Sequence, residues 1–326
     1  MELLRPALKQ LLRAALLMAA VILLNFLLIH MAPGDPALTI AGEAGGSRPE
    51  VLEELRRLYG LDKSFLAQFW IYVQQVLRGD FGRSFYFNAP VLDLVVARMP
   101  ATALLVLSAL LWSMVLGTAL GVLSARKPDG LLSHTVNVMS VVGYSAPVFW
   151  TGLVLVIVFA SKLPIFPVSD IVDHSRPHAS VLQYMADVGH HLVLPALSLG
   201  LLYLAQFARI ARASMIGVFS ADYIRTARAK GMPEWIVVWK HGLRNGMLPV
   251  ITIAGLQLGH VVSGAVLVET VYSWPGLGRL AYDSILRRDH PTILGILVFS
   301  TLLVVVVNFL TDLAYRLADP RIRLSR

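Results

Sequence analysis

Long apolar runs alternate with polar stretches along the whole of this 326-residue chain. A helix needs about 20 predominantly apolar residues to cross the hydrocarbon core of a bilayer, and six runs qualify. The pattern therefore predicts an all-α membrane protein with six transmembrane helices, the fourth being the weakest, at residues 14–31, 99–125, 135–161, 191–208, 245–268 and 292–311. The residues after the first run make a poor cleavage site, so we interpret that run as a retained helix rather than a signal peptide.

The segment between the first two runs, residues 32–98, is too long for a plain loop and predicts short helices of its own. Ser47 and Glu50 form a capping box and Gly60 supplies a stop, which together favour an amphipathic helix. Apolar and aromatic residues at helical spacing favour a second helix over residues 65–77 with a packing face, ended by a glycine-rich turn.

Charge distinguishes the two sides of the predicted membrane. Only 15% of the residues are charged, against roughly a quarter in soluble domains, and the net charge is +8. The termini and the two inner loops carry 16 Lys and Arg against 6 Asp and Glu, whereas the three opposite segments carry 12 against 14. By the positive-inside rule both termini are cytoplasmic, and the basic balance reflects topology rather than binding of nucleic acid.

Two parts of the chain follow from this topology. Residues 1–98 hold the first transmembrane helix and the extracytoplasmic segment. Residues 99–326 hold a core of five transmembrane helices, with a cytoplasmic loop at residues 209–249.

Few polar or small residues interrupt the predicted helices, and they cluster on faces. In the second helix a small-residue stripe, typical of close helix packing, consists of Ser113, Gly117 and Gly121. In the fifth helix one face carries Gln257, His260 and Gly264. This second face either lines a translocation path or hydrogen-bonds neighbouring helices, and both interpretations stay open.

The predicted outer hairpin between the fifth and sixth helices contains an acid and a Trp-Pro-Gly turn: Glu269, Trp274, Pro275, Gly276 and Gly278. A Trp at the bilayer edge is most simply an interfacial anchor. A loop of this kind also suits an outer gate, and the composition does not choose between the two.

Motifs for covalent chemistry are sparse. The chain has no Walker-type nucleotide loop, no HExxH motif and no cysteine, and the adjacent His190 and His191 are interpreted as a solvated or interfacial pair rather than metal ligands. Ser145 with His260 would suit an intramembrane serine hydrolase, but a hydroxyl beside Pro147 commonly satisfies backbone loosened by the proline. Ser145 is therefore retained as a candidate for the translocation path.

The cationic stretch at residues 221–249 must lie outside the hydrocarbon, where each Arg or Lys would cost about 2.5 to 3.5 kcal/mol. Its spacing predicts a short, mostly polar helix ended by Gly231, with a new helix starting after Pro233. Such an element suits a solvated loop, a surface helix on anionic lipid or a docking element for a cytosolic partner.

The same stretch resembles the cytoplasmic loop of permease subunits in bacterial ATP-binding cassette importers, specifically the peptide and nickel branch, where YxRTARAKG and RNxxLP are typical. The matching residues are Tyr223, Arg225, Thr226, Ala227, Arg228, Ala229, Lys230, Gly231, Leu248 and Pro249. Arg225 stands where the sugar-type pattern has Glu. Further matches at residues 33–36, 79–84, 269–278 and 319–323 extend the resemblance over nearly the whole chain, although His260 is not among them.

The resemblance implies a type I importer fold in the bacterial inner membrane, with no catalysis and no cofactor in this chain. Such a permease forms a heterodimer with a second homologous permease and binds two cytoplasmic ATPases, which hold ATP and Mg²⁺. An extracytoplasmic binding protein delivers the substrate. The resemblance also implies a coupling helix around residues 225–231, seated on the ATPase.

The substrate stays open among dipeptides, longer peptides, glutathione-like tripeptides, nickel chelates and other small solutes. A stand-alone secondary transporter or channel is the alternative, but it should show an internal inverted repeat and acidic residues inside the membrane. The sequence shows neither, since Glu269 and Asp312 lie at predicted helix ends. The serine hydrolase is the least favoured reading.

Overall fold

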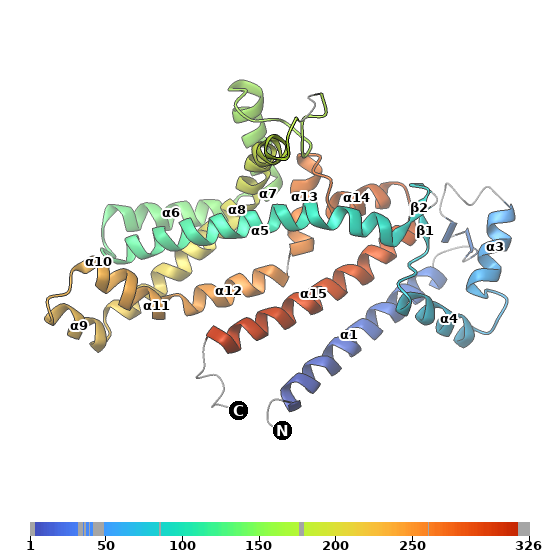
Figure 1. The fold of residues 1–326 in the computed structure, drawn as a ribbon, viewed down its shortest axis with the longest axis horizontal. Coiled ribbons are helices and arrows are strands. Elements are labelled where there is room, and N and C mark those ends of the chain that lie inside the picture. Colours follow the sequence, from blue (N-terminus) through green and yellow to red (C-terminus); the bar gives the residue numbers. More distant parts are fainter. Residues whose placement is uncertain are drawn as a thin grey trace. The chain divides into compact units, whose positions relative to one another are not determined.

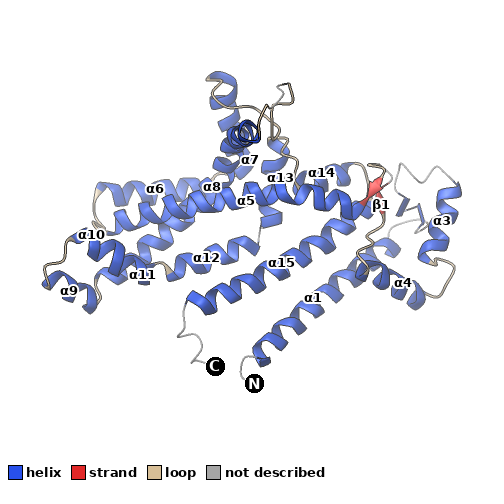
Figure 2. Cartoon of the chain, viewed as in Figure 1, coloured by secondary structure: helices blue, strands red, loops and turns tan. Residues whose placement is uncertain are grey.

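The computed structural model describes residues 4–31, 35, 37–38, 40–41, 49–84, 86–175, 179–259 and 261–318. Within these ranges the regular structure is almost entirely helical, and its one sheet is a two-stranded antiparallel pair (Figure 2). The chain forms two compact units, Met1–Ala101 with Gly276–Arg326, and Thr102–Pro275. Helix α5 (Val91–Ala125) contributes residues to both.

The first unit is built on α1 (Leu4–Met31) and α15 (His290–Ala318), which lie side by side (Figure 1). The buried Asn25 amide of α1 donates to the Leu294 carbonyl oxygen of α15 at 3.1 Å. The other elements of this unit are α3 (Pro49–Tyr59), α4 (Phe65–Leu77), β1 (Arg83–Ser84), β2 (Ala89–Pro90) and α14 (Leu277–Leu286).

Both short helices predicted before the second apolar run are present. Helix α4 covers the predicted residues 65–77, and its packing face lies on α1, where Phe65, Phe69 and Tyr72 surround the Phe26 ring at centroid distances of 5.0, 5.2 and 6.1 Å. Helix α3 begins at Pro49, whereas Ser47 of the predicted capping box lies outside the described residues.

A buried carboxylate ties the small sheet to the start of α15. Asp289 immediately precedes that helix, and its Oδ2 accepts from the Ser84 hydroxyl at 2.5 Å and from the Thr292 hydroxyl at 2.7 Å. A helix N-terminus favours negative charge. The two hydroxyl donors and the helix end together offset the desolvation of this group.

The second unit contains the remainder of α5 and a series of helices of very different lengths. They are α6 (Leu131–Ser145), α7 (Val148–Leu155), the π-helix η1 (Val156–Lys162), α8 (Val181–Phe219), α9 (Asp222–Ala229), α10 (Glu234–Ile236), the π-helix η2 (Val237–Gly242), α11 (Leu243–Gly246), α12 (Leu248–Gly259) and α13 (Val261–Val271).

The weakest predicted span is the middle of a far longer helix. Helix α8 has 39 residues, about 58 Å at 1.5 Å per residue, against roughly 30 Å of hydrocarbon. The helix therefore extends beyond both ends of the predicted span, residues 191–208. The polar residues that end the apolar run do not end the helix. Trp112 of α5 lies on α8 at Gly200 and donates from Nε1 to the Ala196 carbonyl oxygen at 3.1 Å.

The small-residue stripe of α5 packs on α8, as the sequence predicts. A Cβ atom at Gly117 would stand 2.8 Å from the Leu204 carbonyl oxygen, and one at Gly121 would stand 2.5 Å from that of Ala208. Both distances are shorter than any ordinary carbon–oxygen contact, so the two backbones touch only because these residues lack side chains. The third member, Ser113, instead donates to the Leu110 carbonyl oxygen of its own helix.

The third predicted span is not one continuous helix, which corrects the sequence prediction of residues 135–161. Helices α6 and α7 meet at Pro147 with a bend of 103°. Proline disfavours helical backbone in the residue before it, and Ala146 is accordingly extended, with φ −77° and ψ 127°. In the described part of the chain four helices are long and apolar enough to cross a membrane, or five if the bent pair is one span.

We expect Gly121→Ala to destabilise the protein by about 1 to 3 kcal/mol, the usual cost of overpacking, because the new methyl group meets the α8 backbone. Gly217→Ala is the matched control, since it lies in α8 with no described atom within 4 Å of its Cβ position, and alanine there should stabilise by up to about 1 kcal/mol. Thermal unfolding of the detergent-purified variants measures both. Equal unfolding temperatures for the two would contradict the role assigned to Gly121.

Candidate functional site

The predicted short cationic helix is α9, which follows the C-terminal end of α8 (Figure 1). Its apolar edge faces inward, with Ile224 fully buried and Ala227 nearly so, packed with Val237 and Val218. The helix is thus amphipathic, whereas the sequence predicted a mostly polar one. Its exposed side carries Tyr223, Arg225, Thr226, Arg228, Ala229 and Lys230.

Helix α9 ends at Gly231, as predicted. The φ angle of +72° at this residue lies in the left-handed region that favours glycine, and the Met232 N–H donates back to the Ala227 carbonyl oxygen at 3.3 Å. No described atom lies within 4 Å of a Cβ at this position, so backbone conformation rather than space requires glycine here. Pro233 then precedes α10, as predicted.

The Arg228 guanidinium forms a bidentate ion pair with the Glu234 carboxylate. Its Nε lies 3.2 Å from Glu234 Oε2 and its Nη2 lies 2.9 Å from Oε1, and its guanidinium stands 5.8 Å from the centroid of the Phe219 ring. These hydrogen bonds hold the pKa of the Glu234 carboxyl below its ordinary value of 4.5, and the charge of Arg126 acts in the same direction. Arg225, in contrast, pairs with Asp222 on the exposed surface of α9.

The segment after α9 connects it to two long helices. Val238 of η2 packs in one apolar cluster with Val122 and Ala125 of α5 and with Met215 of α8. The segment after α9 is therefore packed against the ends of both helices. Leu248 and Pro249, which the sequence grouped with this loop, lie apart from α9 at the start of α12, and both are exposed.

Two of the candidates for the translocation path, Ser145 and Gln257, form hydrogen bonds with other residues. The Ser145 hydroxyl donates to the Val141 carbonyl oxygen at 2.8 Å, as expected for backbone near a proline. The Gln257 amide of α12 donates to Gln206 Oε1 of α8 at 2.6 Å. His260 lies outside the described residues, and Gly264 lies within α13.

The outer hairpin candidates are largely buried, which corrects the view of Trp274 as an interfacial anchor. Trp274 and Glu269 are both fully buried, and the Trp274 N–H donates to the Glu269 carbonyl oxygen at 2.8 Å. The Glu269 carboxylate accepts from the Thr102 hydroxyl at 2.6 Å. Gly276 precedes α14 in extended conformation, next to Pro275, and Gly278 is buried in the first turn of that helix.

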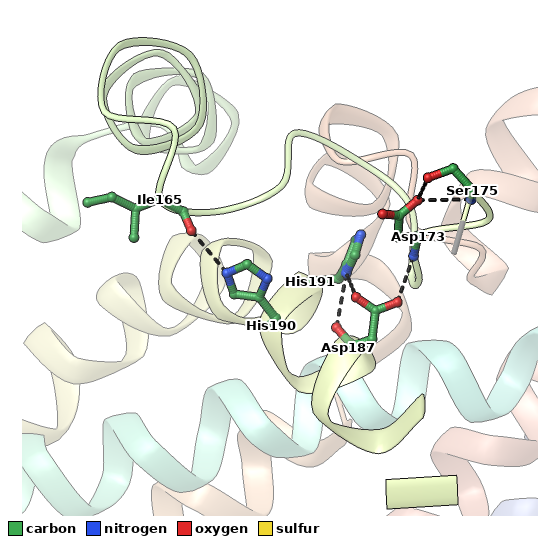
Figure 3. A network of polar contacts seen from close by, with 6 residues as sticks. All are labelled: Ile165, Asp173, Ser175, Asp187, His190 and His191. Atoms are coloured by element: carbon green, nitrogen blue, oxygen red, sulfur yellow. Dashed lines mark hydrogen bonds and ion pairs between the residues drawn. The ribbon is translucent and has the colours of Figure 1, made fainter. Parts of the chain in front are cut away.

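His190 and Asp187 of α8 hydrogen-bond a loop, and His191 pairs with Asp187 (Figure 3). His190 Nε2 lies 3.0 Å from the Ile165 carbonyl oxygen, and His191 Nδ1 lies 3.2 Å from Asp187 Oδ1. The other carboxylate oxygen of Asp187 accepts from the Asp173 N–H at 2.7 Å. His191 is buried, so of the two predicted alternatives, a solvated or an interfacial pair, the solvated one is wrong for this residue.

A family model described as "Binding-protein-dependent transport system inner membrane component" matches residues 117–324. A second model, for the N-terminal part of such membrane components, matches residues 3–106. The chain belongs to this family of inner-membrane permeases. It is therefore a multi-pass transport subunit of the inner membrane, without catalytic activity of its own.

Relatives of this permease match it from end to end. It is 40% identical over 317 residues to the dipeptide transport system permease protein DppB of Escherichia coli (strain K12), covering 92% of this chain and 93% of the relative. It is 41% identical over 320 residues to the di/tripeptide transport system permease protein DppB of Pseudomonas aeruginosa (strain UCBPP-PA14), covering 94% and 95%. The glutathione transport system permease protein GsiC of Escherichia coli (strain K12) is 40% identical over 304 residues, with 92% of each chain covered.

These similarities confirm the predicted membership in the peptide-type ATP-binding cassette importers and the role of a permease subunit. Neither the secondary transporter nor the serine hydrolase fits this family.

Three residues of the permease that make defined contacts in the structure were not predicted from the sequence: Gln206, Glu234 and Tyr272. Gln206 could have been found as the amide in the fourth apolar run, and Glu234 as an acid in the first turn after Pro233.

Tyr272 had no sequence signal of its own. It is 1% exposed, and its hydroxyl donates to the Gly152 carbonyl oxygen of α7 at 3.1 Å. The same hydroxyl lies 2.8 Å from Ser198 Oγ of α8. It thereby joins the turn after α13 to two other helices.

We expect the Arg228–Glu234 ion pair to stabilise the loop at residues 221–246 against local opening at neutral pH. In acid the ion pair should be lost. Because the folded pKa of Glu234 is depressed, the stabilisation is present above pH 4.5 and disappears as pH falls through the lower, folded-state value. Both partners are about two-fifths exposed, so the effect is less than about 1 kcal/mol.

Hydrogen exchange of residues 221–246, corrected for the intrinsic pH dependence, measures this protection. Glu234→Gln should exchange a few-fold faster than the unaltered permease at pH 7, and the difference should vanish at low pH. A difference that is the same at every pH would contradict the assignment to this carboxylate.

Proposed function

We propose that this permease carries small peptides across the inner membrane as one subunit of an ATP-driven importer. One observation carries the proposal: the relatives named for dipeptides, for di- and tripeptides and for glutathione, itself a tripeptide, each match over more than 90% of both chains. All three names refer to peptides, so nickel chelates are the less favoured substrate class.

In this proposal the permease has six membrane-spanning segments, the type I importer fold and cytoplasmic termini. The asymmetric distribution of Lys and Arg supports the orientation. The bent pair α6–α7 and the shorter pair α12–α13 supply the third and fifth segments. Arg212 of α8 donates to Ser133 Oγ at 2.8 Å and to the Pro128 carbonyl oxygen at 3.3 Å, which is consistent with both basic regions lying on one side.

The partners follow from the architecture of such importers. A second homologous permease completes the transmembrane pathway, two ATPases that bind ATP and Mg²⁺ lie on the cytoplasmic side, and an extracytoplasmic binding protein supplies the peptide. The permease itself holds no cofactor and contacts membrane lipid rather than nucleic acid. ATP-driven closure of the ATPases selects one of two permease conformations through different contacts in each.

The coupling helix of this proposal is α9. Its buried apolar edge fixes it to the protein, while its exposed edge offers Tyr223, Arg225 and Lys230 to a partner. Aromatic residues and Arg are enriched at the centres of protein interfaces, and Trp235, 67% exposed, extends the same surface. Arg228 lies on the same exposed side, and its pairing with Glu234 also links α9 to the segment that follows it.

Peptide import can be tested with the permease reconstituted in liposomes together with its partner permease, ATPases and binding protein. We expect ATP-dependent uptake of labelled di- and tripeptides, and little uptake of a nickel chelate. Uptake of the chelate without uptake of peptide would overturn the substrate class while leaving the importer assignment intact.

We expect Arg225→Glu to weaken ATPase docking by about tenfold, which corresponds to about 1.4 kcal/mol, because it reverses an exposed charge at the centre of the docking surface. Lys127→Glu is the matched control, with the same charge change at an exposed residue outside α9. Co-purification with the ATPases and peptide-stimulated ATP hydrolysis measure the effect. If both variants behave alike, α9 is not the coupling element.

A further inference from the structure

Two glutamine side chains meet between α8 and α12, in segments predicted to cross the membrane. The Gln257 Nε2 group donates to Gln206 Oε1 at 2.6 Å. Both residues are half-buried. The pair therefore lies at the edge of the helix packing, with part of each amide open.

Most of the hydrogen-bonding capacity of this pair is unused. A glutamine amide has two N–H donors and an oxygen with two acceptor sites, and the bond between the two residues uses one donor and one acceptor. Among the described residues neither amide has another hydrogen-bond partner. The side-chain atoms that are both buried and without a partner in the described residues belong to other residues. The open atoms of the two glutamine amides are therefore not fully enclosed.

The pair lies deep relative to the predicted cytoplasmic boundary. Gln257 follows Leu248, the first residue of α12, by nine positions, or about 14 Å along a helix. Gln206 precedes Arg212 by six positions, or about 9 Å, and Arg212 contacts the basic loop at Pro128. Both amides thus fall within the roughly 30 Å hydrocarbon layer.

Open amide atoms at that depth require a polar neighbour, because lipid offers no hydrogen bonds. Polar groups inside membrane proteins accordingly face the bundle interior or a water-filled cavity. We propose that the Gln206–Gln257 pair lines the aqueous pathway of the importer and hydrogen-bonds the peptide groups of the substrate as they pass. This inference rests on the proposed import of peptides.

The chemistry of the pair matches that of its proposed substrate. A peptide group offers one N–H donor and one carbonyl acceptor, and the open atoms of the two glutamines present both complementary functions without a charge. An uncharged site of this kind binds the backbone common to all peptides rather than particular side chains. It also holds the substrate weakly enough to release it.

Water access can be measured directly because the chain contains no cysteine. Single substitutions Gln206→Cys and Gln257→Cys are made in the complete importer, and labelling by a membrane-impermeant thiol reagent is read on this chain by mass. Leu256→Cys is the control at equal depth, since Leu256 is an exposed apolar residue next to Gln257 on α12. Lys127→Cys, at an exposed residue outside the proposed docking surface, confirms that the reagent is active.

We expect labelling at positions 206 and 257 in at least one nucleotide state, protection by saturating peptide, and slow labelling at position 256. Absence of labelling at both positions, with position 127 labelled, would overturn the proposal. Equal labelling at positions 256 and 257, or labelling that peptide does not reduce, would do so as well.

Recognition of the peptide group is tested with a substrate analogue in which an ester replaces the amide and so removes its N–H donor. Gln206→Met and Gln257→Met should lower peptide uptake several-fold while lowering uptake of the ester analogue less. All measurements use the same binding protein, saturated with the peptide or with the ester analogue. Its own preference between the two therefore cancels when a variant is compared with the unaltered permease.

A purely structural role for the pair would lower both uptakes equally, and that result would refute the inference. Failure of the unaltered permease to import any peptide would instead refute the proposed function. The two failures are therefore distinguishable in one set of measurements.

Discussion

Backbone contact between α5 and α8 is the interaction on which the second unit depends. At Gly117 and Gly121 the two helices approach until a single methyl group would overlap a carbonyl oxygen, and Trp112 closes the same interface at Gly200. In a membrane, where apolar side chains gain little by leaving lipid for protein, such close packing replaces the hydrophobic effect as the source of specificity. It holds in place α8, which carries Ser198 and Gln206.

Helix α8 makes different contacts along its length. Near its start it holds the loop around Asp173 through Asp187 and His190 (Figure 3), in its middle it carries Ser198 and Gln206, and near its end Met215 supports the segment that follows α9. The helix is continuous over 39 residues but has Pro195 within it, where the backbone lacks one N–H donor and helices tend to kink. The contacts with the loop precede this proline, whereas Ser198, Gln206 and Met215 follow it.

The sequence predicts those features that arise from local rules, and it fails where tertiary contacts decide. The end of α9 at Gly231 and the extent of α4 follow from conformational preference and helical spacing, and both are confirmed. The burial of Trp274 and His191 could not be read from composition, because it depends on segments distant in sequence. The pairing of Arg228 with Glu234 requires the turn at Gly231 to reverse the chain, and the pairing of Gln206 with Gln257 requires two helices to meet. The roles of these residues in transport stay predictions.

The break at Pro147 has a consequence for the assembled importer. Proline has no N–H, so the Gly143 carbonyl oxygen loses the donor that residue 147 would supply in a helix, and the bend of 103° exposes backbone at a depth where lipid gives no compensation. The Ser145 hydroxyl satisfies only the Val141 carbonyl oxygen. A carbonyl oxygen without a donor is costly in lipid, so we expect water or a neighbouring subunit to cover this bend in the assembled importer.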